Sequence, residues 1–124
     1  IGYHERKEKR MTRTFIQTRE FIKNWEDLGL NDDDLRRLEL LIMSDPQIGV
    51  VMRGTGKLRK LRFALENRGK SGSARVCYVD FLALETVYLI TVYPKSVKEN
   101  LTNAERNNIK KMIDQLEQNI MTEV

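Results

Sequence analysis

Hydrophobic residues change their spacing along the first half of the chain. Residues 13–17 include Thr, Phe and Ile and are typical of a short edge strand. From Thr18, the expected N-cap, hydrophobic residues fall at helical spacing. A second helical stripe begins at 31–32, where three aspartates suit the N-terminal helix dipole, and it ends before Pro46. This half therefore predicts a strand and two helices, followed by a loop at 49–56.

The next segment alternates between hydrophobic and basic residues, as a half-buried strand does. In 57–65, Leu61 and Phe63 point to one face, whereas Lys60 and Arg62 point to the other. The alternation predicts a strand with one face in the core and one basic face.

Two more strands and a helix complete the pattern. Residues 74–81 and 86–93 are rich in β-branched and aromatic residues, and the short connection at 82–85 favours an antiparallel hairpin. The sequence Thr102-x-x-Glu105 then predicts a capping box at the start of the last helix.

This order of elements predicts an α+β fold. Two N-terminal helices and one C-terminal helix are expected to pack on an antiparallel sheet, in the order β-α-α-β-β-β-α. The length of 124 residues fits a single domain, which we expect to span 11–124. Residues 1–10 are mostly charged and without periodicity, so they are interpreted as a disordered leader or a cloning remnant.

Composition and residue counts exclude several classes of protein. The single cysteine, Cys77, cannot form an internal disulfide, and no apolar run is long enough to span a membrane, so we expect a cytoplasmic protein. The only histidine, His4, lies in the expected leader. No cluster of Cys, His and carboxylates has metal-ligand spacing, and no Ser-His-Asp set is present. Neither a metal nor a cofactor is therefore expected.

The positive charge is concentrated in one segment. The net charge of the whole chain is +4, but residues 53–75 carry +7, because Glu66 alone opposes eight basic residues. This surface is either a solvated sheet face or a site that neutralises the phosphates of a nucleic acid. The eight residues are Arg53, Lys57, Arg59, Lys60, Arg62, Arg68, Lys70 and Arg75.

Three motifs that occur in order resemble a known family. They are the Gly- and Lys-rich stretch 54–62, the stretch 69–78 with Arg75 ahead of Val-x-Tyr, and Tyr88 to Lys95. Over about Met11 to Glu117 the chain resembles the HigB branch of the RelE/ParE toxin superfamily. The resemblance implies a compact sheet with helices on one face, and cleavage of messenger RNA in the ribosomal A site. It also implies a cognate antitoxin, often a helix-turn-helix protein of the HigA kind.

The resemblance also implies roles for individual residues. Lys60 and Arg62 match two cations that face the RNA, Arg75 matches an arginine on the next strand, and Lys95 matches a cation after the last strand. Tyr93 is the nearest substitute for a tyrosine that some relatives place in the closing helix region. Four further cations are expected to bind RNA: Lys57, Arg59, Arg68 and Lys70.

The expected chemistry is attack of the RNA 2′-hydroxyl on the adjacent phosphate, without a metal ion. Arg62 and Arg75 are expected to stabilise the phosphoryl oxygens, because guanidinium groups bind phosphate in a bidentate manner. Both are expected to face away from the core. Lys60 or Lys95 is the expected proton-transfer group, provided that neighbouring cations tune it.

Two other functions remain open from the sequence. One is a ParE-like inhibitor of DNA gyrase, which shares the fold and cleaves nothing. The other is an RNA-binding module without activity, which would be expected to carry exposed aromatic residues among its cations.

Overall fold

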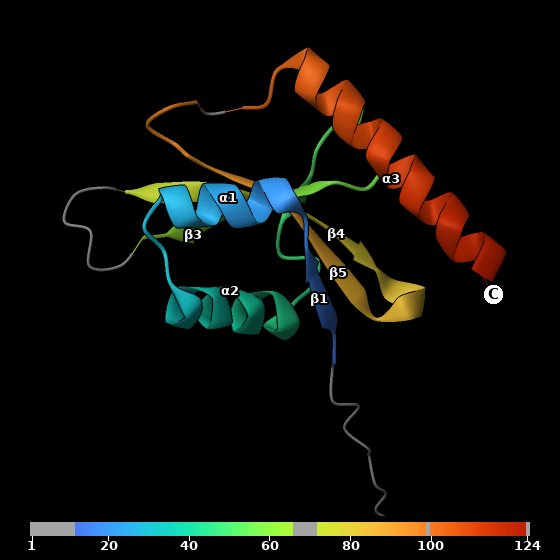
Figure 1. Cartoon of the computed structure of the whole chain (residues 1–124), viewed down its shortest axis with the longest axis horizontal. Helices are drawn as coiled ribbons and strands as arrows, with labels where there is room; N and C mark the ends of the chain where they lie inside the picture. Colours follow the sequence, from blue (N-terminus) through green and yellow to red (C-terminus); the bar gives the residue numbers. More distant parts are fainter. Residues whose placement is uncertain (1–11, 66–71, 99, 124) are drawn as a thin grey trace, which may run out of the picture.

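The computed structural model describes residues 12–65, 72–98 and 100–123, and it shows the predicted α+β fold (Figure 1). The segment 1–10 lies outside the described residues. In chain order the elements are β1 (Thr14–Gln17), α1 (Arg19–Asp27), α2 (Asp32–Ser44), β2 (Val50–Val51), β3 (Arg59–Ala64), β4 (Ser73–Phe81), the short 3-10 helix η1 (Leu82–Leu84), β5 (Thr86–Pro94) and α3 (Asn103–Glu123).

The sheet has five strands in the order β1-β5-β4-β3-β2, and it differs from the prediction in two respects. First, β1 pairs in parallel with β5, so the sheet is mixed, although β2, β3, β4 and β5 pair antiparallel. Second, the predicted loop contains β2, which has only two residues, both exposed. A strand this short leaves no alternation to detect.

Helices cover both faces of the sheet, whereas the family resemblance implied one face. On one face α1 and α2 pack over one core cluster, which includes Phe21, Leu38 and Phe63. On the other face α3 packs over a second cluster, which includes Cys77, Ile109 and Ile113. Figure 1 shows α3 standing apart from the pair α1 and α2. Because β4 runs between the two clusters, almost every one of its residues is buried.

The predicted helix caps are present. The Thr18 side chain accepts a hydrogen bond from the Phe21 N–H at 3.0 Å, which satisfies a donor at the start of α1. At α3, the Glu105 carboxylate accepts from the Thr102 N–H at 2.8 Å, and the Thr102 hydroxyl accepts from the Glu105 N–H at 3.1 Å. These caps fix where α1 and α3 begin relative to the sheet.

Candidate functional site

Three predicted cations lie together on one face of the sheet. Arg62 on β3 is the direct cross-strand neighbour of Arg75 on β4, and Lys60 lies two residues before Arg62, so all three side chains share one face. They line a hollow of about 350 Å³. We call Lys60, Arg62 and Arg75 the cationic trio. The other residues that line the hollow are Ile48, Val50 and Leu61.

A buried serine holds the two arginines of the trio. Ser73 Oγ accepts a hydrogen bond from Arg75 Nη1 at 2.9 Å and another from Arg62 Nε at 3.3 Å. Ser73 is only 4% exposed, so few other conformations are open to its hydroxyl group. One neutral oxygen therefore brings two guanidinium groups close together, in an arrangement suited to an anion with several oxygens. The sequence offered no signal for this role, because serine at the start of a strand is common.

Arg75 is more buried than the sequence suggested. It is expected from the sequence to face away from the core, yet it is 7% exposed, and its cross-strand neighbour Tyr93 belongs to the core cluster under α3. Burial limits the freedom of its guanidinium group, which favours a fixed orientation. It also means that removing Arg75 costs packing as well as charge.

Tyr93 and two residues that the sequence analysis missed extend the site. Tyr93 on β5 is the cross-strand neighbour of Arg75, and its ring lies 5.0 Å from Lys98 Nζ. Lys98 also donates to Glu105 at 2.6 Å, and this bond is the main reason that the pKa of the Glu105 carboxyl is lowered. Lys60 Nζ donates to Asn100 Oδ1 at 2.7 Å. Only the folded chain brings Asn100 into contact with the trio.

The remaining predicted residues do not join the trio through any contact in the described residues. Lys95 is exposed in the turn after β5, where its backbone N–H donates to the Ser73 carbonyl at 3.1 Å. Arg59 instead donates to the carbonyls of Gln47 and Gly49, so it has a structural role. Two predicted RNA-binding residues, Arg68 and Lys70, lie outside the described residues.

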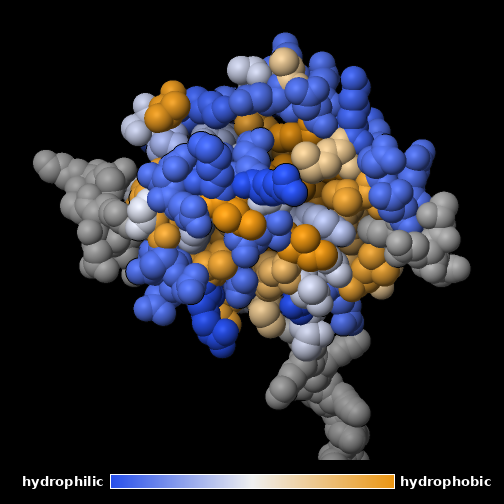
Figure 2. Space-filling view, in the orientation of Figure 1, coloured by the Kyte–Doolittle hydropathy of each residue, from blue (hydrophilic) through white to orange (hydrophobic). Residues whose placement is uncertain are grey.

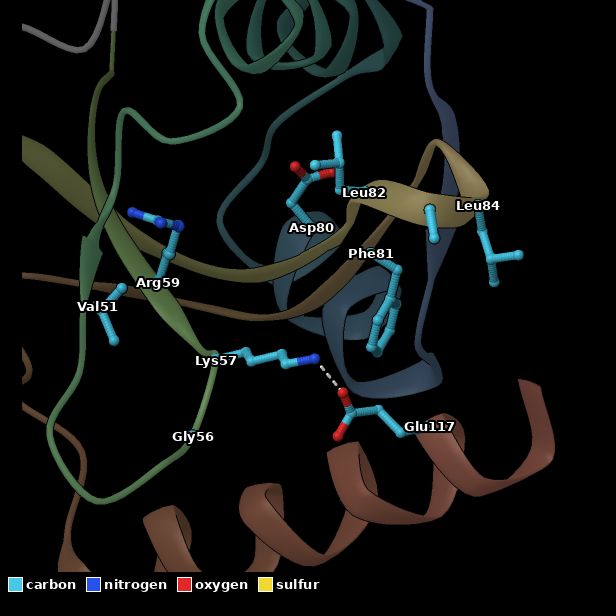
Figure 3. A pocket seen from close by; sticks show the side chains of 10 residues that line it. Val51, Gly56, Lys57, Arg59, Asp80, Phe81, Leu82, Leu84 and Glu117 are labelled. Atoms are coloured by element: carbon cyan, nitrogen blue, oxygen red, sulfur yellow. Dashed lines mark hydrogen bonds and ion pairs between the residues drawn. The ribbon is translucent and has the colours of Figure 1, made fainter. Parts of the chain in front are cut away.

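Lys57 belongs to a separate cavity of about 430 Å³ (Figure 3). Its ammonium group forms an ion pair with Glu117 of α3 and lies 5.9 Å from the centre of the Phe81 ring. Leu82 and Leu84 of η1 give the cavity an apolar side. The basic segment seen in the sequence is therefore divided between a convergent site and cations that tie elements together.

Cys77 is the small buried residue that the sequence predicted. Burial raises the pKa of its thiol to about 12, although Tyr93 and nearby cations act in the opposite direction. A thiol of this kind is a poor nucleophile at neutral pH. Across 12–65, 72–98 and 100–123, no group of three or more His, Cys, Asp or Glu side chains is placed to hold a metal ion.

Figure 2 shows one face of the described part of the chain. Hydrophilic residues predominate on its left side and along its top, whereas hydrophobic residues gather from its centre toward the right. None of the helices in the described ranges is both long and apolar enough to cross a membrane.

Comparison with solved structures identifies the fold. A free-state mutant of the E. coli toxin RelE, in which two arginines are replaced by alanine, superposes with a TM-score of 0.52 at 18% identity. The match covers 72% of this chain and 90% of that toxin. The fold is RelE-like. No family model matches the sequence.

Two further solved structures are similar to this RelE-like chain. The isolated E. coli RelE toxin has a TM-score of 0.49 at 16% identity, and the match covers 82% of this chain and 99% of that toxin. An archaeal RelE in the RelE–RelB complex of Pyrococcus horikoshii has a TM-score of 0.46 at 20% identity, with 71% and 100% covered.

Proposed function

We propose that this protein is a RelE-like toxin of a toxin–antitoxin pair, and that it cuts messenger RNA bound to the ribosome. The single observation that carries the proposal is the cationic trio, with two of its members held on one buried hydroxyl group. Phosphoryl transfer in RNA needs fixed positive charge near the phosphate oxygens, and β3 and β4 of this chain present such charge on one face of the sheet.

The proposed reaction begins when the RNA 2′-hydroxyl gives its proton to the solvent and its oxygen attacks the adjacent phosphorus. The bond from phosphorus to the 5′-oxygen breaks, so a 2′,3′-cyclic phosphate forms and the 5′-oxygen leaves with a proton. Arg62 and Arg75 stabilise the non-bridging oxygens, whose negative charge grows in the transition state. Lys60 is the proposed donor of the proton to the leaving oxygen, because its ammonium group already donates to Asn100 at 2.7 Å beside the arginines. The solvent afterwards restores to Lys60 the proton that leaves with the 5′-oxygen.

Tyr93 and Lys95 have weaker support as proton-transfer groups. Tyr93 lies opposite Arg75 on the neighbouring strand and is only 5% exposed, so it supports the position of Arg75 from within the core. Lys95 lies in the turn that follows β5 and shares only a backbone contact with Ser73. We assign Tyr93 to the positioning of Arg75, and Lys95 to phosphate binding away from the reacting bond. Lys57, Arg68 and Lys70 are retained as expected contributors to the attraction of RNA.

The finer assignment rests on the sequence motifs. The stretches 54–62, 69–78 and 88–95 support the HigB branch, and with it a helix-turn-helix antitoxin of the HigA kind and action in the cytoplasm. Co-expression with the cognate antitoxin should then suppress the growth arrest that the toxin causes.

The test is to add the purified full chain to translating ribosomes and to map the ends of the messages by primer extension. The proposal predicts new ends inside reading frames, at positions occupied by ribosomes. A gyrase inhibitor of the ParE kind would leave messages intact and reduce DNA supercoiling by gyrase. An inactive RNA-binding module would give neither effect.

A further inference from the structure

Two exposed aliphatic side chains lie beside the cationic trio. Val50 on the edge strand β2 is the direct cross-strand neighbour of Lys60, so both side chains point to the same face. Ile48 lies two residues earlier, and both line the hollow that the trio lines. Val50 is 73% exposed and Ile48 is 38% exposed. We call this pair the apolar wall.

The apolar wall is held in place from beneath. The Gly49 N–H donates to the Tyr78 hydroxyl at 2.9 Å, and that hydroxyl donates to the Pro46 carbonyl at 2.8 Å. Arg59 Nη1 donates to the Gly49 carbonyl at 2.7 Å. A Cβ on Gly49 would lie 2.9 Å from Tyr78 Cε1, so only glycine lets the segment pack this closely.

Rigid exposed aliphatic groups beside fixed cations match the two parts of a nucleotide. The trio offers charge to a phosphate, and β-branched side chains, which are stiff at χ1, offer a flat apolar surface to the face of a base. We infer that a nucleobase of the bound RNA packs on Ile48 and Val50 while its phosphate lies on the trio. This inference rests on the proposed function.

The wall makes a further prediction about the kind of RNA. Contact with the face of a base is largely independent of sequence, because every base has such a face. A base inside a duplex keeps its faces covered by its neighbours, so the ligand must be single-stranded and locally unstacked. The wall would therefore add affinity for any unpaired nucleotide without selecting a codon.

The test compares binding of intact and abasic RNA by the full chain. The probe is a fluorescent single-stranded 2′-O-methyl RNA of about six nucleotides, which cannot be cleaved, and a matched series carries one abasic site at each position. The Val50→Ala variant should bind the intact RNA roughly threefold to tenfold more weakly, because methyl groups are lost from the contact. It should bind one of the abasic RNAs as the unmodified protein does. The Val50→Phe variant should bind intact RNA more tightly, since an aromatic ring stacks on a base.

Val51→Ala is the matched control. It makes the same chemical change on the same strand, but Val51 points to the other side and lines the cavity in Figure 3. The inference is overturned if the Val50 and Val51 variants bind alike, if Val50→Ala weakens all abasic RNAs as much as intact RNA, or if the unmodified protein does not bind the intact RNA. Cleavage on ribosomes is a separate readout. If Val50→Ala weakens binding of intact RNA but not of one abasic RNA, and no cleavage occurs, only the proposed function is refuted. If cleavage occurs but Val50→Ala affects intact and abasic RNA alike, only the role of the apolar wall is refuted.

Discussion

Replacement of Arg62 by Met is expected to stabilise the folded protein while it removes most of the cleavage activity. Arg62 and Arg75 are direct cross-strand neighbours, and both donate to Ser73 Oγ. Like charges that face each other on adjacent strands repel. Methionine keeps an unbranched side chain and removes the charge, so the main change is the loss of this repulsion. Residues that serve a reaction often lower stability in this way.

The size of the effect follows from the geometry. Two groups that donate to one oxygen at 3.3 and 2.9 Å lie roughly 5 Å apart, and at an effective dielectric constant of about 20 they repel by roughly 3 kcal/mol. Arg62 is exposed, so water and salt reduce this value to about 1 kcal/mol. The long hydrogen bond to Ser73 is lost, which leaves a net gain in unfolding free energy of about 0.5 kcal/mol or slightly more. For a domain of this size that gain raises the Tm by roughly 2–4 °C.

The assay is urea and thermal unfolding of the unmodified protein and the Arg62→Met variant at low salt and at about 1 M salt, where the Debye length is only about 3 Å. The gain should appear at low salt and shrink at high salt. Arg36→Met, on an exposed position of α2, is the control and should change stability by less than about 0.5 kcal/mol. A variant that is less stable at low salt, or a gain that salt leaves unchanged, would refute the repulsion.

Three further results are expected. Ser73→Ala should lower cleavage roughly tenfold to a hundredfold by freeing both arginines, whereas Ser73→Thr, which keeps the hydroxyl, should retain most activity; equal losses in rate assays would contradict this role. Because the Lys98 bond lowers the pKa of Glu105, this carboxylate stabilises the fold above its ordinary pKa of 4.5, and the contribution is lost as the pH falls below that value. Between about pH 3 and 6, the unfolding free energy of Glu105→Gln should therefore fall less steeply with decreasing pH than that of the unmodified protein. Equal slopes would contradict the pairing. Lys60→Ala should reduce the slope of log affinity for single-stranded RNA against log salt by about 0.7, whereas exposed Lys111→Ala should not; equal slopes would show only long-range attraction.

The strand alternation was enough to predict the basic face. Leu61 and Phe63 are buried, and Lys60 and Arg62 lie on the opposite side, as the two-residue period of a strand requires. The helix caps could also be predicted from the sequence, since they depend on residues three positions apart. The parallel pairing of β1 with β5 could not be predicted, because alternation within one strand contains no information about the direction of its neighbour.

The polar contacts around the trio could not be predicted from the sequence. Asn100 is 40 positions from Lys60 along the chain, and no local pattern in the sequence indicates that the two side chains are in contact. Charge counting also treated all cations of 53–75 as equivalent. The fold separates Arg59, which binds backbone carbonyls, from Arg62 and Arg75, which share Ser73.

The chemical ends of the cut message test the central claim most directly. Purified protein is mixed with ribosomes programmed with a defined message, and the end groups of both fragments are determined by mass spectrometry. Attack by the 2′-hydroxyl at the cationic trio predicts a 2′,3′-cyclic phosphate on the upstream fragment and a 5′-hydroxyl on the downstream fragment. It also predicts no cut where the nucleotide before the scissile bond is 2′-deoxy. A 3′-hydroxyl with a 5′-phosphate, or cleavage that survives the 2′-deoxy substitution, would contradict the account.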